Sequence, residues 1–217
     1  MRPLALLAHG TRSQAGIAVV EEVARRAAEA AGAEVRLGYV DVCEPTAWEV
    51  LAGLERPVVV PYFVTSGYHV DHDVPDAAAR ARAAVVTPAL GAAPEVVRAL
   101  ADRLPPVSPG TAVLLGGAGS SRDAARDEAH EVAGLLAAEL GVPVRAGFLS
   151  GPGPQAADVL AELRSDHGRV VAGALLLAPG FFHRQLEVLG ADAVAAPLGT
   201  HPALVDLVVR RYRDAAG

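Results

Sequence analysis

Short apolar runs alternate along the whole chain with segments in which apolar residues recur at the spacing of one helix face. This alternation is typical of βαβ units, in which parallel strands are buried between helices. In the first half it predicts strands at 3–8, 34–40, 57–63 and 84–87. Between the first two strands it predicts a helix that stops at Gly32. The helix face consists of Ile17, Val20, Ala24, Ala27, Ala28 and Ala31.

The same pattern restarts in the second half. Three stretches recur at an offset of 108 or 109 residues: 6–10 aligns with 114–118, 38–45 with 147–154, and 90–94 with 198–202. A repeat at a nearly constant offset indicates an internal duplication, and the proline-rich segment 104–110 reads as a linker. We therefore expect an α/β protein of two similar lobes, 1–106 and 107–217, each a small parallel β-sheet flanked by helices. A ligand is expected in the cleft between them.

The two copies differ at polar positions. His9 aligns with Gly117, and Glu44 aligns with Gly153. The stretch 67–69, which ends in His69, aligns with 180–182, although His183 stands next door. The first copy thus holds the polar groups, and the chemistry is expected in lobe 1–106.

Composition narrows the class of protein. The chain has 217 residues, of which 52% are hydrophobic and 20% charged, as in an ordered globular protein. Its net charge of −6 argues against nucleic-acid binding. Cys43 is the single cysteine, which excludes an internal disulfide and a thiolate cluster. No apolar run approaches the roughly 20 residues of a membrane span, and 1–8 reads as a strand rather than a signal peptide, so a cytoplasmic location is expected.

Three polar clusters follow predicted strands, where ligands of open parallel sheets gather. The first consists of His9, Gly10, Thr11, Arg12 and Ser13. Glycine lets the backbone approach a ligand, the following helix N-terminus favours an anion, and an arginine fork binds a carboxylate. The alternative is that Thr11 or Ser13 caps the helix. A cap does not account for His9, and a lone histidine at a strand end is structural about as often as functional.

The second cluster contains Cys43 and Glu44. Glu44 is either a metal ligand or proton carrier, or a solvated loop acid, while Cys43 fits a small buried filler better than a soft ligand. The third cluster places two histidines and two aspartates within His69–Asp73. Its composition suits a divalent metal, but its spacing matches no zinc pattern, and Asp73 could equally cap a helix.

The three clusters, in this order, resemble the sirohydrochlorin chelatases, which belong to the class II, ATP-independent chelatases that insert a metal. The resemblance is carried by Ala8–Arg12, by Glu44–Thr46, by Val60–Phe63, and by Gly67–Val70 with Asp73–Pro75. It covers the first 105 residues, with Thr11 in place of the usual serine. The second half resembles the family's long form, in which a fused copy lacks the two histidines.

The resemblance implies that His9 and His69 face each other across the cleft, bind the incoming metal and help to remove pyrrole protons, while Glu44 assists. It implies substrate contacts along the first and third clusters, namely Gly10, Thr11, Arg12, Ser13, Gly67 and Tyr68. The implied substrate is sirohydrochlorin, an acidic tetrapyrrole, and the implied metal substrate is Co²⁺ or Fe²⁺, with Ni²⁺ also acceptable to such ligands. The implied enzyme is a lyase of siroheme or cobalamin biosynthesis, monomeric or homodimeric, without an organic cofactor.

Two other functions remain open from the residues. One is a phosphatase or phosphomutase with His9 as nucleophile and Arg12 on the phosphate, although such sites gather several arginines. The other is a metal or tetrapyrrole carrier that binds without turnover. A regulatory second lobe with His183 as a remnant ligand is a further hypothesis.

Overall fold

The computed structural model describes residues 2–82 and 84–217; Met1, at the start of the apolar N-terminal run, and Ala83 lie outside the described residues. The chain forms two compact units. The first unit comprises Met1–Gly91 together with Thr200–Gly217, and the second unit comprises Ala92–Gly199. Among the described residues, no helix is both long and apolar enough to cross a membrane.

The first unit contains a parallel sheet in the order β2-β1-β3-β4. Its elements are β1 (Leu4–Ala8), α1 (Gln14–Ala31), β2 (Val35–Tyr39), α2 (Ala47–Ala52), β3 (Val58–Pro61), α3 (Tyr68–Asp71), α4 (Asp73–Ala78), β4 (Val85–Val86) and α9 (Pro202–Ala216). All four predicted strands are confirmed, each shorter than predicted. The predicted helix is also confirmed as α1, because the Ser13 hydroxyl accepts the N–H of Gly16 at its start and Gly32 ends it with φ 62°.

The second unit repeats this topology, with a parallel sheet in the order β6-β5-β7-β8. Its elements are α5 (Pro94–Arg103), β5 (Thr111–Gly117), α6 (Asp123–Leu140), β6 (Val144–Phe148), α7 (Ala156–Asp166), β7 (Arg169–Leu175), α8 (Phe181–Glu187) and β8 (Ala193–Val194). The predicted fold class, two parallel sheets each flanked by helices, is therefore confirmed.

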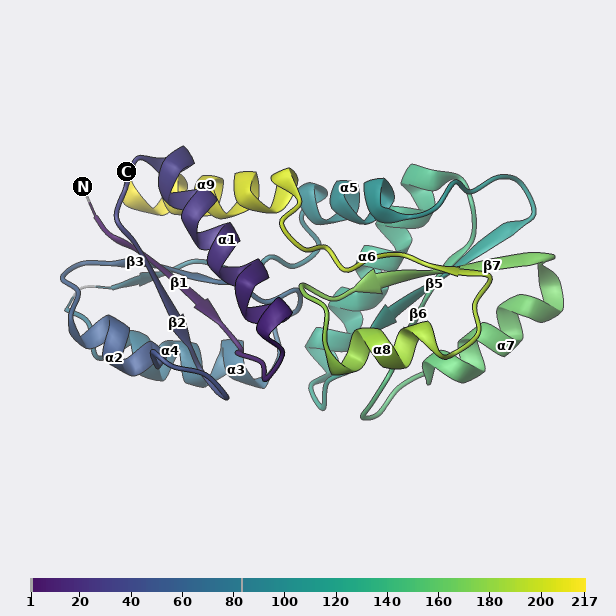
Figure 1. Cartoon of the computed structure of the whole chain (residues 1–217), viewed down its shortest axis with the longest axis horizontal. Helices are drawn as coiled ribbons and strands as arrows, with labels where there is room; N and C mark the ends of the chain where they lie inside the picture. Colours follow the sequence, from purple (N-terminus) through teal and green to yellow (C-terminus); the bar gives the residue numbers. More distant parts are fainter. Residues whose placement is uncertain (1, 83) are drawn as a thin grey trace. The chain divides into compact units, whose positions relative to one another are not determined.

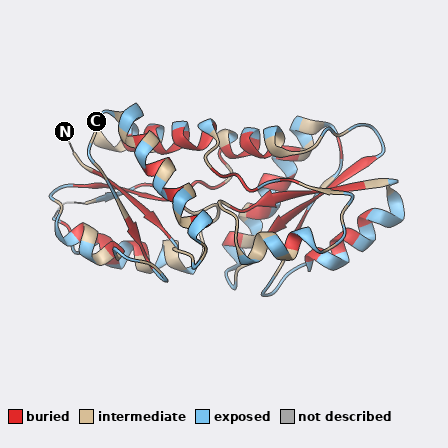
Figure 2. Ribbon diagram, viewed as in Figure 1, coloured by how far each residue is buried: buried red, intermediate tan, exposed pale blue. Residues whose placement is uncertain are grey.

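The core of each unit lies on both faces of its sheet (Figure 2). In the first unit every residue of β1 is buried. Its Ala5 and Leu7 pack with the buried residues of α2 and α4. Helices α1 and α9 lie side by side in the same unit, and α9 also contacts β3 (Figure 1). The central strands therefore lie between two layers of helices.

The compact units do not follow the boundary between the two sequence copies, 1–106 and 107–217. Helix α5 belongs to the first copy but packs on β7 and α6 of the second unit, where it buries Val97 and Leu100 among others. Helix α9 belongs to the second copy but packs on α1 and β3 of the first unit, where it buries Leu207 and Tyr212. The segment 104–110 accordingly lies inside the second unit, and the chain passes between units after residues 91 and 199.

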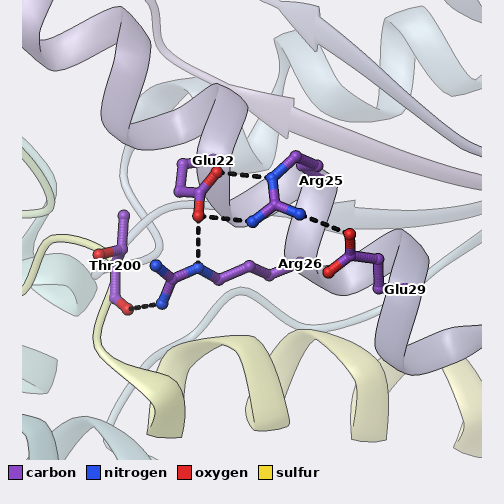
Figure 3. A network of polar contacts seen from close by, with 5 residues as sticks. All are labelled: Glu22, Arg25, Arg26, Glu29 and Thr200. Atoms are coloured by element: carbon purple, nitrogen blue, oxygen red, sulfur yellow. Dashed lines mark hydrogen bonds and ion pairs between the residues drawn. The ribbon is translucent and has the colours of Figure 1, made fainter.

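Arginine side chains hold the chain where it enters and leaves each unit. In the first unit Arg211 on α9 donates to the carbonyl of Ala89, and Arg26 on α1 donates to that of Thr200 at 3.2 Å (Figure 3). In the second unit Arg103 donates to the carbonyl of Leu198. These bonds attach α5 and α9, or the chain beside them, to the unit in which each helix packs.

The arginine on α1 is itself oriented by a carboxylate. Glu22 accepts from the Nε of Arg26 at 2.6 Å and from Arg25 through both oxygens (Figure 3). Its hydrogen bonds to Arg25 and then to Arg26 lower the pKa of Glu22 to about 2. The carboxylate therefore stays ionised under all but strongly acidic conditions.

Candidate functional site

Two histidines meet at the carboxyl edge of the first sheet. His9 follows β1 directly, and His69 lies in α3, just beyond β3. Strands β1 and β3 are hydrogen-bonded neighbours that run parallel, so both end at the same edge. The two imidazole ring centroids are 4.5 Å apart and the ring planes are perpendicular. Both histidines come from the first unit, so the second unit is not needed to form the pair.

The loop after β1 is pressed against the loop after β2. Gly10 has φ 95°, and a Cβ atom built on it would lie 2.1 Å from the carbonyl oxygen of Asp41. One residue further on, the N–H of Thr11 donates to the Sγ of Cys43 at 3.2 Å, and that thiol donates to the carbonyl of Thr11 at 3.0 Å. Glycine at position 10 therefore permits two loops to touch, and Cys43 is a half-buried link between them rather than a free ligand.

The imidazole of His9 is exposed and contacts the backbone of the next residue. Its Nδ1 lies 3.1 Å from the carbonyl oxygen of Gly10. A carbonyl oxygen only accepts hydrogen bonds, so this contact requires a proton on Nδ1. The lone pair of the neutral ring is then on Nε2.

The imidazole of His69 has contacts on several sides. The ring of Phe63, which is partly buried in the core beneath α2 and α4, stacks on it with 6.3 Å between centroids. Its Nδ1 lies 2.5 Å from the Oδ2 of Asp73, and about 30% of its side-chain surface remains exposed. The exposed ring of Tyr68 meets it edge-on at 5.9 Å and lies 4.6 Å from the ring of His72. The rings of Phe63 and Tyr68 therefore flank the imidazole of His69, and Asp73 lies at its Nδ1.

The remaining predicted site residues have different positions. The hydroxyl of Ser13 caps α1, and the hydroxyl of Thr11 accepts the N–H of Ser13, so the predicted helix cap is present at Ser13. Arg12 is exposed in the same loop. Glu44 is exposed in the loop between β2 and α2, and within residues 2–82 and 84–217 it has no hydrogen bond or ion pair to either imidazole.

The donor set at this edge consists of two imidazoles. Among the described residues, no group of three or more His, Cys, Asp or Glu side chains is arranged to hold a metal ion. The third nearby candidate, Asp73, is bound to Nδ1 of His69, on the ring edge away from Nε2. A pair of neutral imidazoles binds a divalent ion without enclosing it, unlike a four-ligand structural site.

A model of the CbiX family matches residues 3–106 and again residues 112–215. The chain belongs to the CbiX family. Each match covers one copy, so the predicted internal duplication is confirmed. The family match, together with the relatives described next, confirms the predicted resemblance to sirohydrochlorin chelatases.

Individual relatives agree with the family. The chain is 35% identical over 81 residues to a sirohydrochlorin cobaltochelatase of Methanopyrus kandleri; the match covers 35% of this chain and 57% of that relative's length. Among solved structures, SirB from Bacillus subtilis with Fe³⁺ aligns over 100% of this chain and 96% of its own at a TM-score of 0.82 and 24% identity. SirB from Bacillus subtilis subspecies spizizenii in complex with cobalt has the same coverage, with a TM-score of 0.80 and 22% identity. At these identities the structural likeness concerns the fold.

Within the CbiX fold, strand register shows what replaces His9 in the second copy. Ala8 pairs with Tyr39, and Gly117 pairs with Phe148 in the equivalent strands. His9 therefore corresponds to Ala118, and the sequence alignment with Gly117 was wrong by one residue. The backbone agrees, because the next residue in each copy is a glycine with φ near 100° pressed against a carbonyl of the neighbouring loop.

The counterpart of His69 is an aromatic residue. Gly67 precedes α3 and Gly180 precedes α8 as N-cap residues, which places Phe182 at the position of His69. The adjacent His183 serves another purpose: its Nε2 lies 3.1 Å from the carbonyl oxygen of Ala195, and its side chain is only 12% exposed. Neither histidine of the first copy is thus repeated in the second copy.

Sequence reasoning missed two residues of this site. Phe63 was read only as part of a motif, and Asp73 was read as a metal-site or capping residue rather than as a partner of His69. A signal for Asp73 was present, because residues four apart share one helix face. The signal was obscured by His72, which separates α3 from α4 with φ −123° and ψ −64°.

Proposed function

We propose that this CbiX chain is a chelatase that inserts a divalent metal ion into sirohydrochlorin, with its active site in the first copy. The observation that carries the proposal is the contact between the imidazoles of His9 and His69, 4.5 Å apart at the carboxyl edge of the sheet. In the proposed reaction one nitrogen of each ring binds the same ion. The family membership and the cobaltochelatase relative support the same reaction.

The proposed role of the pair is to hold the incoming ion transiently. Imidazole suits Fe²⁺, Co²⁺ and Ni²⁺, and two such ligands leave several coordination positions for water or for the pyrrole nitrogens of the ring. An ion held by few protein ligands passes readily to four ring nitrogens, whereas a complete protein cage would retain it. The sparse donor set among the described residues is therefore consistent with a metal in transit.

Insertion also requires a proton acceptor. The divalent ion replaces two pyrrole N–H protons, so each turnover releases two protons while the ring takes up the metal. Neutral imidazole accepts protons near pH 7, which gives His9 and His69 a second role. Glu44, exposed in the neighbouring loop, is the proposed carrier of protons to solvent.

The substrate is a planar ring with carboxylate groups at its rim. We assign the carboxylates to Arg12 and to the N-terminal end of α1, where the helix dipole favours an anion beside the loop that contains Gly10, Thr11 and Ser13. The ring face is assigned to Tyr68, a residue that is 55% exposed beside His69, with Gly67 allowing close approach. Since the net charge is −6, attraction for an acidic ring must come from this local arrangement.

The proposed metal substrate and pathway are based on the named relatives. One relative is named a cobaltochelatase, and SirB structures contain Fe³⁺ or cobalt. We propose Co²⁺ or Fe²⁺ as the metal substrate, with Ni²⁺ as a further acceptable ion, in siroheme or cobalamin synthesis. The reaction needs no organic cofactor, and we expect it in the cytoplasm, from a monomer or homodimer.

The test is anaerobic incubation of the purified chain with sirohydrochlorin and either Co²⁺ or Fe²⁺, followed by the absorbance change on metallation. His9→Ala and His69→Ala should each lower the rate by at least about 100-fold, within the range that a general base contributes. The exposed His130 on α6 provides a matched control, and His130→Ala should leave the rate unchanged.

Three results would contradict the proposal. Ring binding without turnover would favour the carrier function, because binding and insertion use the same groups. Full activity in both histidine variants would refute the assignment of the site. A chain that neither binds nor metallates the ring, but cleaves phosphate esters in a His9-dependent way, would favour the phosphatase.

A further inference from the structure

We infer that Asp73 is a positioning residue that, together with the backbone carbonyl of Gly10, fixes both imidazoles with Nδ1 protonated and the Nε2 lone pair free. The inference rests on the proposed function, because it concerns how the His9–His69 pair presents its nitrogens to a divalent metal substrate. It assigns to Asp73 no contact with metal or ring; the residue acts through His69.

The geometry at His69 carries the first half of the inference. The distance from its Nδ1 to the Oδ2 of Asp73 is 2.5 Å. An ionised carboxylate only accepts hydrogen bonds, so the proton of this contact resides on Nδ1 when the imidazole is neutral. Histidine ligands of metals are commonly oriented by such a second partner on the other nitrogen.

Asp73 is itself held in place by the core. It is the first residue of α4, and the next residue, Val74, is fully buried with Ala77 in the cluster beneath α2 and α4. Only 23% of the Asp73 side chain is exposed. Phe63 stacks on a face of the imidazole of His69. The ring is therefore restrained by a carboxylate at one edge and an aromatic face beneath it.

The geometry at His9 carries the second half. Its Nδ1 faces the carbonyl oxygen of Gly10, which is likewise only an acceptor. That carbonyl is set by the unusual backbone of Gly10, with φ 95° and close contact to Asp41. Two different acceptors, a side-chain carboxylate and a backbone carbonyl, thus favour the same tautomer, with the proton on Nδ1, in two imidazoles that contact each other.

If Asp73 only stabilised α4, its substitution would have the same effect as substitution of another acidic residue in the first turn of that helix. An acidic residue in the first turn of a helix stabilises that helix through the backbone dipole, whatever its partner. Asp76 lies in the same first turn of α4 and is exposed. It is therefore the matched control, because Asp76→Asn removes the same charge from the same turn without touching His69.

The experiment compares the full-length wild-type chain with Asp73→Asn and Asp76→Asn. Long-range ¹H–¹⁵N NMR of the metal-free protein at alkaline pH reports which ring nitrogen carries the proton, with the His69 signals identified from His69→Ala. Co²⁺ affinity is measured separately by competition with a chelator. We expect Nδ1–H for both His9 and His69 in the wild type. Asp73→Asn should redistribute the His69 proton and weaken Co²⁺ binding by about 10- to 100-fold, and Asp76→Asn should change neither.

Other results would overturn the inference. It is wrong if His69 keeps its Nδ1 proton in Asp73→Asn, if Asp76→Asn weakens Co²⁺ binding as much, or if the wild type binds no Co²⁺ at all. The outcome that separates it from the proposed reaction is Co²⁺ binding that depends on Asp73 in a chain that does not metallate sirohydrochlorin. That result supports the positioning role and contradicts only the chelatase.

Discussion

Substitution of Gly10 by alanine tests whether the glycine next to His9 serves loop packing. With φ 95°, the residue adopts a backbone conformation that side chains disfavour, and its Cβ would lie 2.1 Å from the carbonyl oxygen of Asp41. Real Cβ atoms essentially never approach other atoms closer than 3.0 Å. The two loops would therefore have to separate by about 0.9 Å.

Three terms determine how much Gly10→Ala changes the free energy of unfolding. A left-handed backbone costs a non-glycine residue about 1–2 kcal/mol, of which roughly 0.4–1 kcal/mol is returned by the stiffer unfolded chain. Separation of the loops also weakens the two hydrogen bonds between Thr11 and Cys43, each contributing about 0.5–1.5 kcal/mol. We expect Gly10→Ala to destabilise the first unit by about 2–4 kcal/mol. The carbonyl that orients His9 would move with the loop, so Co²⁺ binding should weaken as well.

Gly32 provides the control. It also has a positive φ, 62°, but a Cβ there would meet nothing within 4 Å, so Gly32→Ala should cost only about 1 kcal/mol. Urea unfolding can be followed through Trp48, the single tryptophan, which packs on the core beneath α2 and α4 of the first unit. Equal shifts of the unfolding midpoint for the two variants would refute the close-contact reasoning, because both share the backbone cost and only Gly10 has the contact.

Three further predictions concern single contacts. The folded pKa of Glu22 is about 2 against an ordinary 4.5, so its contribution to stability is present above pH 4.5 and lost as the pH falls toward 2. In urea titrations Glu22→Gln should therefore be less stable than wild type at pH 7, and the difference should disappear between pH 4.5 and pH 2. A difference that does not depend on pH would contradict this prediction. Thr46→Ala removes the capping box of α2 and should destabilise the first unit by about 1 kcal/mol in urea unfolding followed through Trp48, whereas an unchanged midpoint would mean that the cap is not needed. His183→Ala removes the imidazole that contacts the carbonyl of Ala195, so it should lower the free energy of unfolding by about 1–3 kcal/mol in urea unfolding followed by circular dichroism. Co²⁺ affinity should stay unchanged, and weaker Co²⁺ binding would identify His183 as a metal ligand.

The fold class was predictable because its signals are local. Strands buried on both faces produce continuous apolar runs, and helices covering them show one apolar face, so the order of elements follows directly from the sequence. The stop at Gly32 was predictable for the same reason, since a left-handed C-cap favours glycine. The strand ends were less predictable: β3 ends at Pro61, but Tyr62 still donates its N–H to the carbonyl of Leu7 in β1 and is fully buried, so the apolar run continues past the strand.

The exchange of α5 and α9 between the copies could not be read from the sequence. The two helices are equivalent in the duplication and both present an apolar face. Either helix therefore has a pattern that fits either sheet, and periodicity does not decide between them. The choice depends on tertiary contacts such as Arg103 with Leu198 and Arg211 with Ala89, which join residues about a hundred positions apart.

The histidine pair was predicted in part, through residue types and family resemblance. What sequence could not supply was the direction of each ring, because that depends on the Gly10 carbonyl and on Asp73. The alignment of the copies also failed by one residue at His9. Equivalent glycines at positions 10 and 119 show the correct offset only once their backbone angles, 95° and 102°, are known.

The second copy shows what this glycine does in the absence of the proposed site residues. Gly119 has the same close approach as Gly10, since its Cβ would lie 2.0 Å from the carbonyl oxygen of Ser150. Yet Ala118 stands where the first copy has His9, and Gly153 stands where it has Glu44. Because this backbone conformation persists in the copy that lacks counterparts of His9 and Glu44, it serves loop packing in both copies. In the first copy the residue before the glycine is His9, which lies at the sheet edge. The same loop packing sets the position of the Gly10 carbonyl, and this carbonyl contacts the Nδ1 of His9 and orients its imidazole.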